Sequence, residues 1–152
     1  MSAWVGINVS KATLDVVLVR GTESQHTQVS NNKAGFRTLE NFLKKLCREN
    51  AHVCLEATGL HGAGVAEFLH GRRYGVSVVN PLRIKAYADS QLKRNKTDRS
   101  DAALIADFCR TQQPAAWQPL APEVKELRAM LRHLDDLQAM RQQEANRLKS
   151  GE

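Results

Sequence analysis

The chain has 152 residues, a length that fits one domain of ordinary size with an additional helix. Hydrophobic residues make up 42% of it and charged residues 25%, so a folded core is expected rather than disorder. Lysine and arginine number 22 against 16 acidic residues, and the net charge of +6 favours a polyanionic partner.

The cysteines and the N-terminus indicate the compartment. Cys47, Cys54 and Cys109 form no CxxC pair, which predicts reduced thiols that pack as small apolar groups. The first residues lack the basic and apolar regions of a signal peptide. No stretch approaches the roughly 18 apolar residues that a membrane span needs. We therefore expect a soluble intracellular protein.

The first thirty residues predict three antiparallel strands. Residues 3–8 and 13–20 are apolar and rich in β-branched side chains, and a short turn through Ser10 and Lys11 joins them. Residues 24–30 are more polar and predict a strand at the edge of the sheet.

The pattern then alternates between helices and strands. Asn31 or Asn32 can cap a helix with apolar residues at three- and four-residue steps. Residues 53–55 predict a buried strand leading into Glu56, and residues 58–59 open a helix that closes at Gly71 or Gly75. Another strand, 76–79, stops at an Asn-Pro pair. The order β-β-β-α-β-α-β-α predicts an α/β fold, a mixed sheet flanked by helices.

The second half predicts a basic loop and two helices. Residues 90–97 are polar and basic, and a helix resumes at Asp98. Residues 114–121 contain prolines and predict a linker. Residues 122–149 predict one long helix of roughly 40 Å, too long to lie wholly on so small a domain. Its heptad a and d positions predict a coiled coil, with Gln138 and Arg141 as polar interruptions among Val124, Leu127, Leu131, Leu134, Ala145 and Leu148.

Four polar residues are candidates for one acidic site. Asp98 and Asp101 stand three apart at a helix start, so both face one side, although aspartates there also favour the helix dipole. Glu56 directly follows a buried strand, where open α/β sheets bind ligands. Asn8 ends the first strand. Carboxylates clustered at strand ends repel one another unless a hard cation lies between them, and two Mg²⁺ ions can assist phosphodiester cleavage.

Four ordered motifs, at residues 6–11, 56–59, 79–81 and 96–102, resemble the DEDD-type insertion-sequence transposases. That family includes Piv-type DNA invertases and bridge-RNA-guided recombinases, and the likeness spans roughly residues 4–112. It implies a RuvC-like, RNase H-like domain whose catalytic and metal-binding tetrad is carried here by Asn8, Glu56, Asp98 and Asp101. The implied cofactor is Mg²⁺ or Mn²⁺, two ions in the form with aspartate at position 8.

The first tetrad position departs from the family, which has aspartate where this chain has Asn8. Asparagine keeps one oxygen ligand and loses the negative charge. A deliberate substitution and a natural degenerate copy both explain it, and the fragment is expected to be inactive. Asp15 lies in the next strand and is interpreted as an ordinary polar strand residue.

The resemblance also implies the domains and partners. Residues 1–113 form the RuvC-like domain, 114–121 the linker, and 122–152 a coiled-coil helix expected to precede a missing C-terminal domain with a nucleophilic serine. The parent protein is expected to be a transposase or recombinase of the bacterial cytoplasm. It would bind DNA, with a guide RNA as a further candidate partner, and form at least a dimer through the C-terminal helix.

Basic residues surround the candidate site. We expect nucleic-acid contacts from Lys11, Arg83, Lys85, Lys93, Arg94, Lys96 and Arg99. The alternative for such a cluster is a solvated charged loop.

Two other functions compete with the transposase domain. An inert nucleic-acid-binding and dimerising module is favoured by Asn8 and by the end of the chain after the long helix. An actin-like sugar kinase or ATPase can begin with a similar hairpin, but residues 9–12 lack its Gly/Thr-rich phosphate loop.

Overall fold

The computed structural model of the chain describes residues 2–46, 51–56, 60–91, 98–118 and 122–149, with the backbone alone at 98–100 and 122. The chain forms two compact units that divide between Gln118 and Pro119. Each is described by itself.

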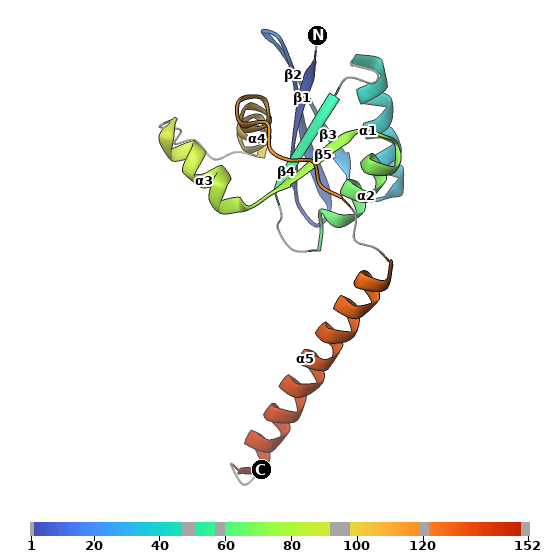
Figure 1. Cartoon of the computed structure of the whole chain (residues 1–152), viewed down its shortest axis with the longest axis vertical. Coiled ribbons are helices and arrows are strands. Elements are labelled where there is room, and N and C mark those ends of the chain that lie inside the picture. Colours follow the sequence, from blue (N-terminus) through green and yellow to red (C-terminus); the bar gives the residue numbers. More distant parts are fainter. Residues whose placement is uncertain (1, 47–50, 57–59, 92–97, 119–121, 150–152) are drawn as a thin grey trace. The chain divides into compact units, whose positions relative to one another are not determined.

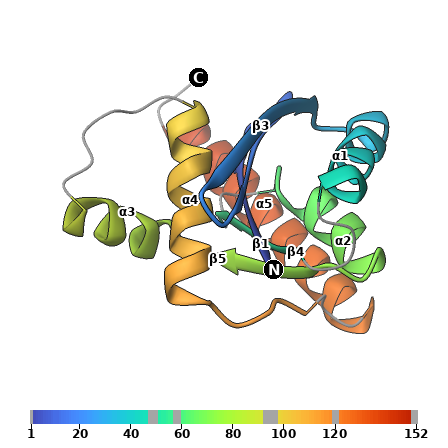
Figure 2. The same cartoon turned by 90° about the horizontal axis from the view of Figure 1, so that it is seen from above.

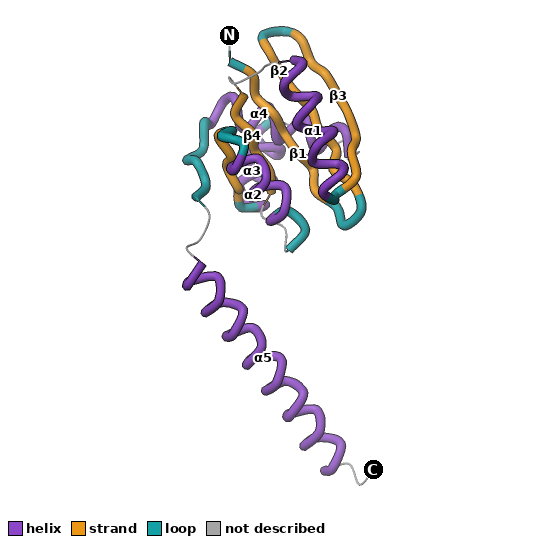
Figure 3. The backbone as a smooth tube through the Cα atoms, turned by 90° about the vertical axis from the view of Figure 1, so that its right-hand side faces the viewer, coloured by secondary structure: helices purple, strands orange, loops and turns teal. Residues whose placement is uncertain are grey.

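A five-stranded mixed sheet forms the centre of the first unit. Its strands are β1 (Ala3–Val9), β2 (Thr13–Arg20), β3 (Glu23–Ser30), β4 (Ala51–Glu56) and β5 (Gly75–Val79), in the order β3-β2-β1-β4-β5. The first three strands form an antiparallel meander (Figure 3), whereas β1, β4 and β5 run parallel. The predicted mixed sheet is confirmed.

Helices cover both faces of this sheet. Helices α1 (Lys33–Leu46) and α2 (Ala63–Gly71) lie on one face, and α4 (Asp98–Gln112) lies on the other (Figures 1 and 2). Helix α3 (Pro81–Ser90) packs beside α4. Because strand residues alternate between faces, Val5 and Ile7 join the α1–α2 core, whereas Gly6 and Asn8 face α4.

Two neighbouring asparagines have different roles at the start of α1. The Asn32 side chain caps the helix, because its Oδ1 accepts a 2.8 Å hydrogen bond from the backbone of Gly35. The Asn31 amide instead donates to the carbonyl oxygens of Ser10, at 2.8 Å, and His61, at 2.9 Å. Asn31 therefore ties the β1–β2 turn to the segment that follows β4.

The segment after α4 runs back along β5. The backbone nitrogen of Trp117 donates to the Val76 carbonyl at 2.6 Å. The buried Ser77 hydroxyl lies 2.9 Å from the Ala115 carbonyl oxygen and 2.7 Å from Nε2 of His52. Burial lowers the pKa of His52. Residues 114–117 are thus attached to the sheet, although the sequence predicted only a linker there.

The second unit is helix α5 (Pro122–Lys149), which confirms the predicted long helix. The apolar side chains of the predicted a and d stripe, Val124, Leu127, Leu131, Leu134 and Leu148, are exposed, as are Met130, Leu137 and Met140. None of the described helices is long and apolar enough to cross a membrane.

The backbone of Gly6 is the place where α4 lies closest to the sheet. A Cβ built on Gly6 would come within 3.0 Å of the Ala102 carbonyl oxygen and the Ala106 backbone. Ala102 and Ala106 are themselves fully buried, with no exposed surface. Only glycine permits this approach, which brings the part of α4 between Ala102 and Ala106 directly onto β1.

Gly6→Ala should therefore lower the free energy of unfolding by about 1–3 kcal/mol or more, because α4 must move away from the sheet. Urea unfolding measures the change. Gly71→Ala is the matched control, since nothing lies within 4 Å of the added methyl group, and its effect should stay within about 1 kcal/mol. Equal effects of the two substitutions would contradict the close-packing argument.

Candidate functional site

Asn8 and Glu56 lie side by side at the carboxyl ends of two parallel strands. The β1–β4 register pairs Gly6 with Cys54 and Ile7 with Leu55, and Asn8 and Glu56 are the next residues on each strand. Alternation turns both toward the α4 face, the same side as Gly6 and Cys54. Both side chains are partly buried.

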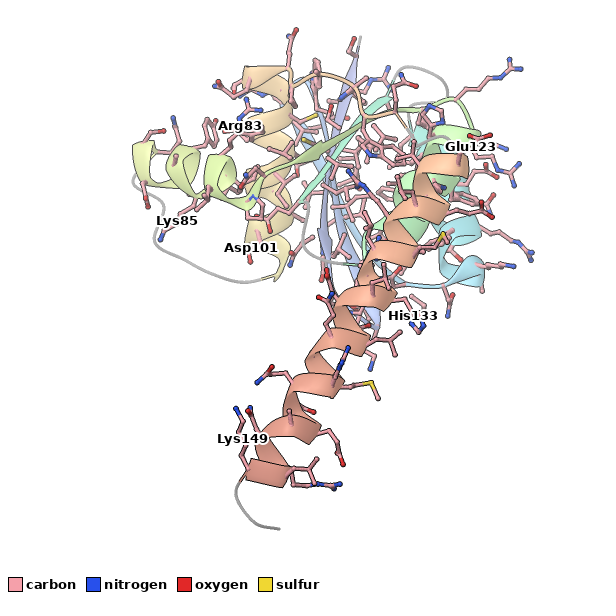
Figure 4. The ribbon with its side chains drawn as sticks, turned by 60° about the horizontal axis from the view of Figure 1, so that its bottom comes forward. Arg83, Lys85, Asp101, Glu123, His133 and Lys149 are labelled. Carbon is pink, nitrogen blue, oxygen red and sulfur yellow. The ribbon has the colours of Figure 1, made fainter. Side chains whose placement is uncertain are left out.

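Asp101 lies on α4, the helix that covers this face of the sheet. It precedes Ala102, the residue that packs on Gly6, and Figure 4 shows it in the first part of α4. Burial and, in addition, the negative charge of Asp101 raise the pKa of the Glu56 carboxyl above its usual value of 4.5. The structure therefore brings Glu56 and Asp101 close enough for their charges to repel.

The remaining tetrad position is defined through its backbone alone. Asp98 is the first residue of α4, and its side chain lies outside the described part. Among the described residues, no three His, Cys, Asp or Glu side chains group closely enough to hold a metal ion. The described donors, two carboxylates and the oxygen of Asn8, are nevertheless of the type that a hard divalent cation prefers. The repulsion between Glu56 and Asp101 is what such a cation would relieve.

Asp15, which the sequence analysis interpreted as an ordinary polar strand residue, is a buried neighbour of Asn8. It is the register partner of Asn8 across the β1–β2 pair, so both side chains share the α4 face. Its exposed fraction is 4%, and its carboxylate accepts a 3.2 Å hydrogen bond from Gln28. A charged residue inside an apolar strand was the signal that could have found it, since carboxylates are seldom buried without a partner.

The basic candidates fall into three groups. Lys11 is exposed in the turn after β1, and Lys85 is exposed on α3. The Arg83 guanidinium lies 5.3 Å from the centre of the Phe108 ring. Phe108 is two helical turns after Asp101 on α4, so Arg83 lies near a later part of this helix than Asp101 does (Figure 4). Lys93, Arg94 and Lys96 lie outside the described residues, as does the side chain of Arg99.

Tyr87 packs against α4. Its ring meets Phe108 edge-on at 5.6 Å, and its hydroxyl donates to the Asp107 carboxylate. Burial raises the pKa of Tyr87, and the hydrogen bond to Asp107 adds to the shift. These contacts give Tyr87 a packing role between α3 and α4.

The raised pKa of Glu56 predicts a pH-dependent effect of Glu56→Gln. The folded chain holds the Glu56 proton more tightly than the unfolded chain, so this group favours folding below pH 4.5 and loses that contribution as the pH rises. Glu56→Gln should therefore raise the free energy of unfolding at pH 7, and the gain should shrink as the pH falls toward 4.5 and be lost below it. Urea unfolding across this range is the measurement.

Asp101→Asn provides the second half of this test. Removing its charge should move the pKa of Glu56 back toward its usual value, as followed by NMR titration of the Glu56 side chain. An unchanged titration would show that the two carboxylates do not interact.

Solved structures resemble this chain in fold. RuvC from Thermus thermophilus in complex with a Holliday junction substrate gives a TM-score of 0.55 at 14% identity, covering 79% of this chain and 100% of that chain. Thermus thermophilus RuvC in a second structure gives 0.53 at 13% identity, covering 75% and 98%. At such identities the likeness concerns the fold alone, and it confirms the RNase H-like, RuvC-like expectation.

Sequence relatives give the family. The pilin gene-inverting proteins of Moraxella bovis and Moraxella lacunata are each 33% identical over 131 residues, 85% of this chain. This chain spans 41% of the length of these relatives. The family model of the IS110-type DEDD transposases, described as a transposase, matches residues 5–151. The chain therefore belongs to the DEDD transposase family.

Proposed function

We propose that this chain is the metal-binding, nuclease-like domain of a DNA transposase or recombinase that acts in insertion-sequence transposition by strand cleavage and exchange. The observation that carries the proposal is the meeting of Glu56 and Asp101 beside Asn8, at the carboxyl end of parallel strands. Membership of the transposase family supports the same reaction class. In this proposal residues 1–113 form the catalytic domain, 114–121 the linker and 122–152 the coiled-coil helix.

The proposed cofactor is Mg²⁺ or Mn²⁺, held by Asn8, Glu56, Asp98 and Asp101. Divalent ions at such a site supply an activated water or hydroxyl and stabilise the leaving oxygen of a phosphodiester. The chain contributes the geometry, because Asp101 directly precedes Ala102, which packs on Gly6 two residues before Asn8. Because Glu56 is partly buried, water competes less with its carboxylate for a bound ion.

Asn8 explains why this form is expected to be inactive. A neutral amide offers one oxygen ligand and no charge, so it replaces a bridging carboxylate poorly. An inert nucleic-acid-binding and dimerising module is the second candidate function for this chain, and the asparagine at position 8 is the observation that favours it.

Asn8→Asp should raise the affinity for Mg²⁺ or Mn²⁺ at least about tenfold, a gain of about 1.4 kcal/mol. Isothermal titration calorimetry of both forms is the measurement, with a thermal-shift series as support because a bound ion stabilises the folded state. Adding Asp101→Ala to Asn8→Asp should remove the gain. If neither substitution changes the affinity, the tetrad assignment is wrong and Asp101 is a helix-start residue.

DNA is the proposed partner, and a guide RNA is a further candidate. Arg83 and Lys85 on α3, together with Lys11 in the β1–β2 turn, can neutralise phosphates near the acidic residues. The proposed contacts are those of Lys11, Arg83, Lys85, Lys93, Arg94, Lys96 and Arg99. Such contacts release counterions, so the binding should be sequence-independent and weaken steeply with salt.

Replacing Lys11, Arg83 and Lys85 together by alanine should weaken binding to a short fluorescent DNA duplex. The salt slope should flatten by about 0.9 for each phosphate that the variant no longer neutralises. Fluorescence anisotropy over a range of salt concentrations measures it. A matched control removes the same charge from the opposite face of the sheet, at the exposed α1 residues Lys33, Arg37 and Lys45. Equal slopes for the two triple variants would assign the basic residues to a solvated surface.

The apolar stripe of α5 is the proposed contact between two copies of the chain. Exposed leucines at heptad a and d positions are buried when two such helices pair. Met130 and Leu137 lie at neighbouring g positions and widen the apolar surface. Gln138 and Arg141, at a and d, should limit the affinity and fix the register.

Leu131→Asp should convert a dimer into a monomer, because it places a charge in the centre of the stripe. Sedimentation equilibrium of the whole chain measures the state. Met140→Asp makes a comparable apolar-to-acidic change at an exposed c position outside the stripe and should leave the dimer intact. A parent chain that stays monomeric at high micromolar concentration would refute the proposed pairing.

A further inference from the structure

A row of polar side chains crosses the sheet on the face covered by α4. The β2–β3 register pairs Gln28 with Asp15, and the β1–β2 register pairs Asp15 with Asn8. Directly opposed residues of antiparallel strands share a face, with Cβ atoms about 5 Å apart. Glu56 continues the row on β4. Three strands therefore lead from an edge of the sheet to the candidate metal site.

Asp15 is the most buried member of this row, with 4% of its surface exposed. Its Oδ1 accepts a hydrogen bond from Nε2 of Gln28 at 3.2 Å, and Nε2 of His26 lies 3.7 Å from the same oxygen. Both neighbours belong to β3, so they approach the carboxylate from the side away from Asn8. Nε2 of His26 is buried and makes no hydrogen bond within the described part of the chain.

Burying the Asp15 carboxylate lowers the stability of the fold, so its presence points to a functional role. A buried carboxylate loses its hydration, and a neutral amide compensates for that loss only in part. A nonpolar residue at position 15 would match the rest of β2, whose neighbours Leu14, Val16 and Val17 are buried and apolar. The Asp15 carboxylate instead places a negative charge beside Asn8, the one tetrad position without a charge.

We infer that Asp15 is a positioning residue for Asn8: it supplies the negative charge that position 8 lacks and turns the Asn8 carbonyl oxygen toward Glu56 and Asp101. The inference rests on the proposed function, in which these residues hold a divalent cation. Asp15 acts through Asn8 in this scheme and is not itself a metal ligand.

The orientation follows from the chemistry of the two side chains. A carboxylate only accepts hydrogen bonds, whereas an amide has a donating nitrogen and an accepting oxygen at opposite corners. With Asp15 on one side, the amide nitrogen of Asn8 is favoured there, and the oxygen then faces the β4 side of the row. The charge of Asp15 also polarises the amide, which makes its oxygen a better ligand for a cation.

Mn²⁺ is the probe for a test on the whole chain, with binding followed by broadening of the NMR signals of residues 7–9 and 54–56. Asp15→Asn should weaken Mn²⁺ binding about tenfold or more, the usual cost of losing a residue that orients a ligand. In an Asn8→Ala background the same substitution should have a much smaller effect, because Asp15 acts through the amide. Glu23→Gln, at the opposite end of the meander, is the control and should leave the affinity unchanged.

Two measurements separate this role from a merely structural one. Thermal unfolding without metal reports any loss of stability, which by itself would not depend on the residue at position 8. In the parent chain, nuclear Overhauser contacts should join the Asn8 side-chain amide protons to the β-protons of Asp15. An amide whose nitrogen faces Glu56 instead overturns the inference, whatever the variants do.

The outcomes also distinguish the inference from the proposed function. If Asn8→Asp binds Mn²⁺ but Asp15→Asn binds it as the parent does, Asp15 has no positioning role and the metal site stands. If Asn8→Asp binds no Mn²⁺ at all, the metal site is wrong, and the role of Asp15 fails with it.

Discussion

The contact between the backbone of Gly6 and the first turns of α4 is the constraint on which the rest of the site depends. It joins a strand and a helix that are far apart in sequence, and it leaves no room for a side chain. Asn8 follows that contact closely on β1, and Asp101 directly precedes it on α4, so close packing decides how far apart they lie. The acidic site is therefore a consequence of how tightly the helix fits the sheet.

Acidic side chains lie near this contact, and basic side chains lie on the neighbouring elements. Burial and, in addition, the negative charge of Asp101 disfavour the ionised form of Glu56 in the folded state. Lys11 and Lys85 lie exposed on neighbouring elements, so the surroundings remain attractive to a polyanion. A bound cation would reduce the repulsion between Glu56 and Asp101. Bound phosphates would neutralise part of the chain's net charge of +6.

Local patterns foretold the elements well. The apolar, β-branched run at residues 13–20 and the heptads after residue 122 require only neighbours along the chain, and they matched β2 and α5. Family motifs, together with the rule that ligands bind at strand ends, predicted that Glu56 and Asp101 lie near each other. The partners of Asp15 escaped notice because the register between strands is not a local property. The same holds for Ser77, whose contacts lie 25 and 38 residues away in sequence.

The attachment of residues 114–117 to β5 has a consequence for assembly. A strand at the end of a sheet offers unpaired amide and carbonyl groups to any passing chain, which is a common route to aggregation. Here the chain's own backbone occupies the Val76 carbonyl, and Trp117 packs beside it against the core. At the other end of the sheet, β3 is largely polar and exposed. The edge at β3 is thus open to solvent, whereas the bonded Val76 carbonyl makes β5 a poor site for strand pairing between copies of the chain.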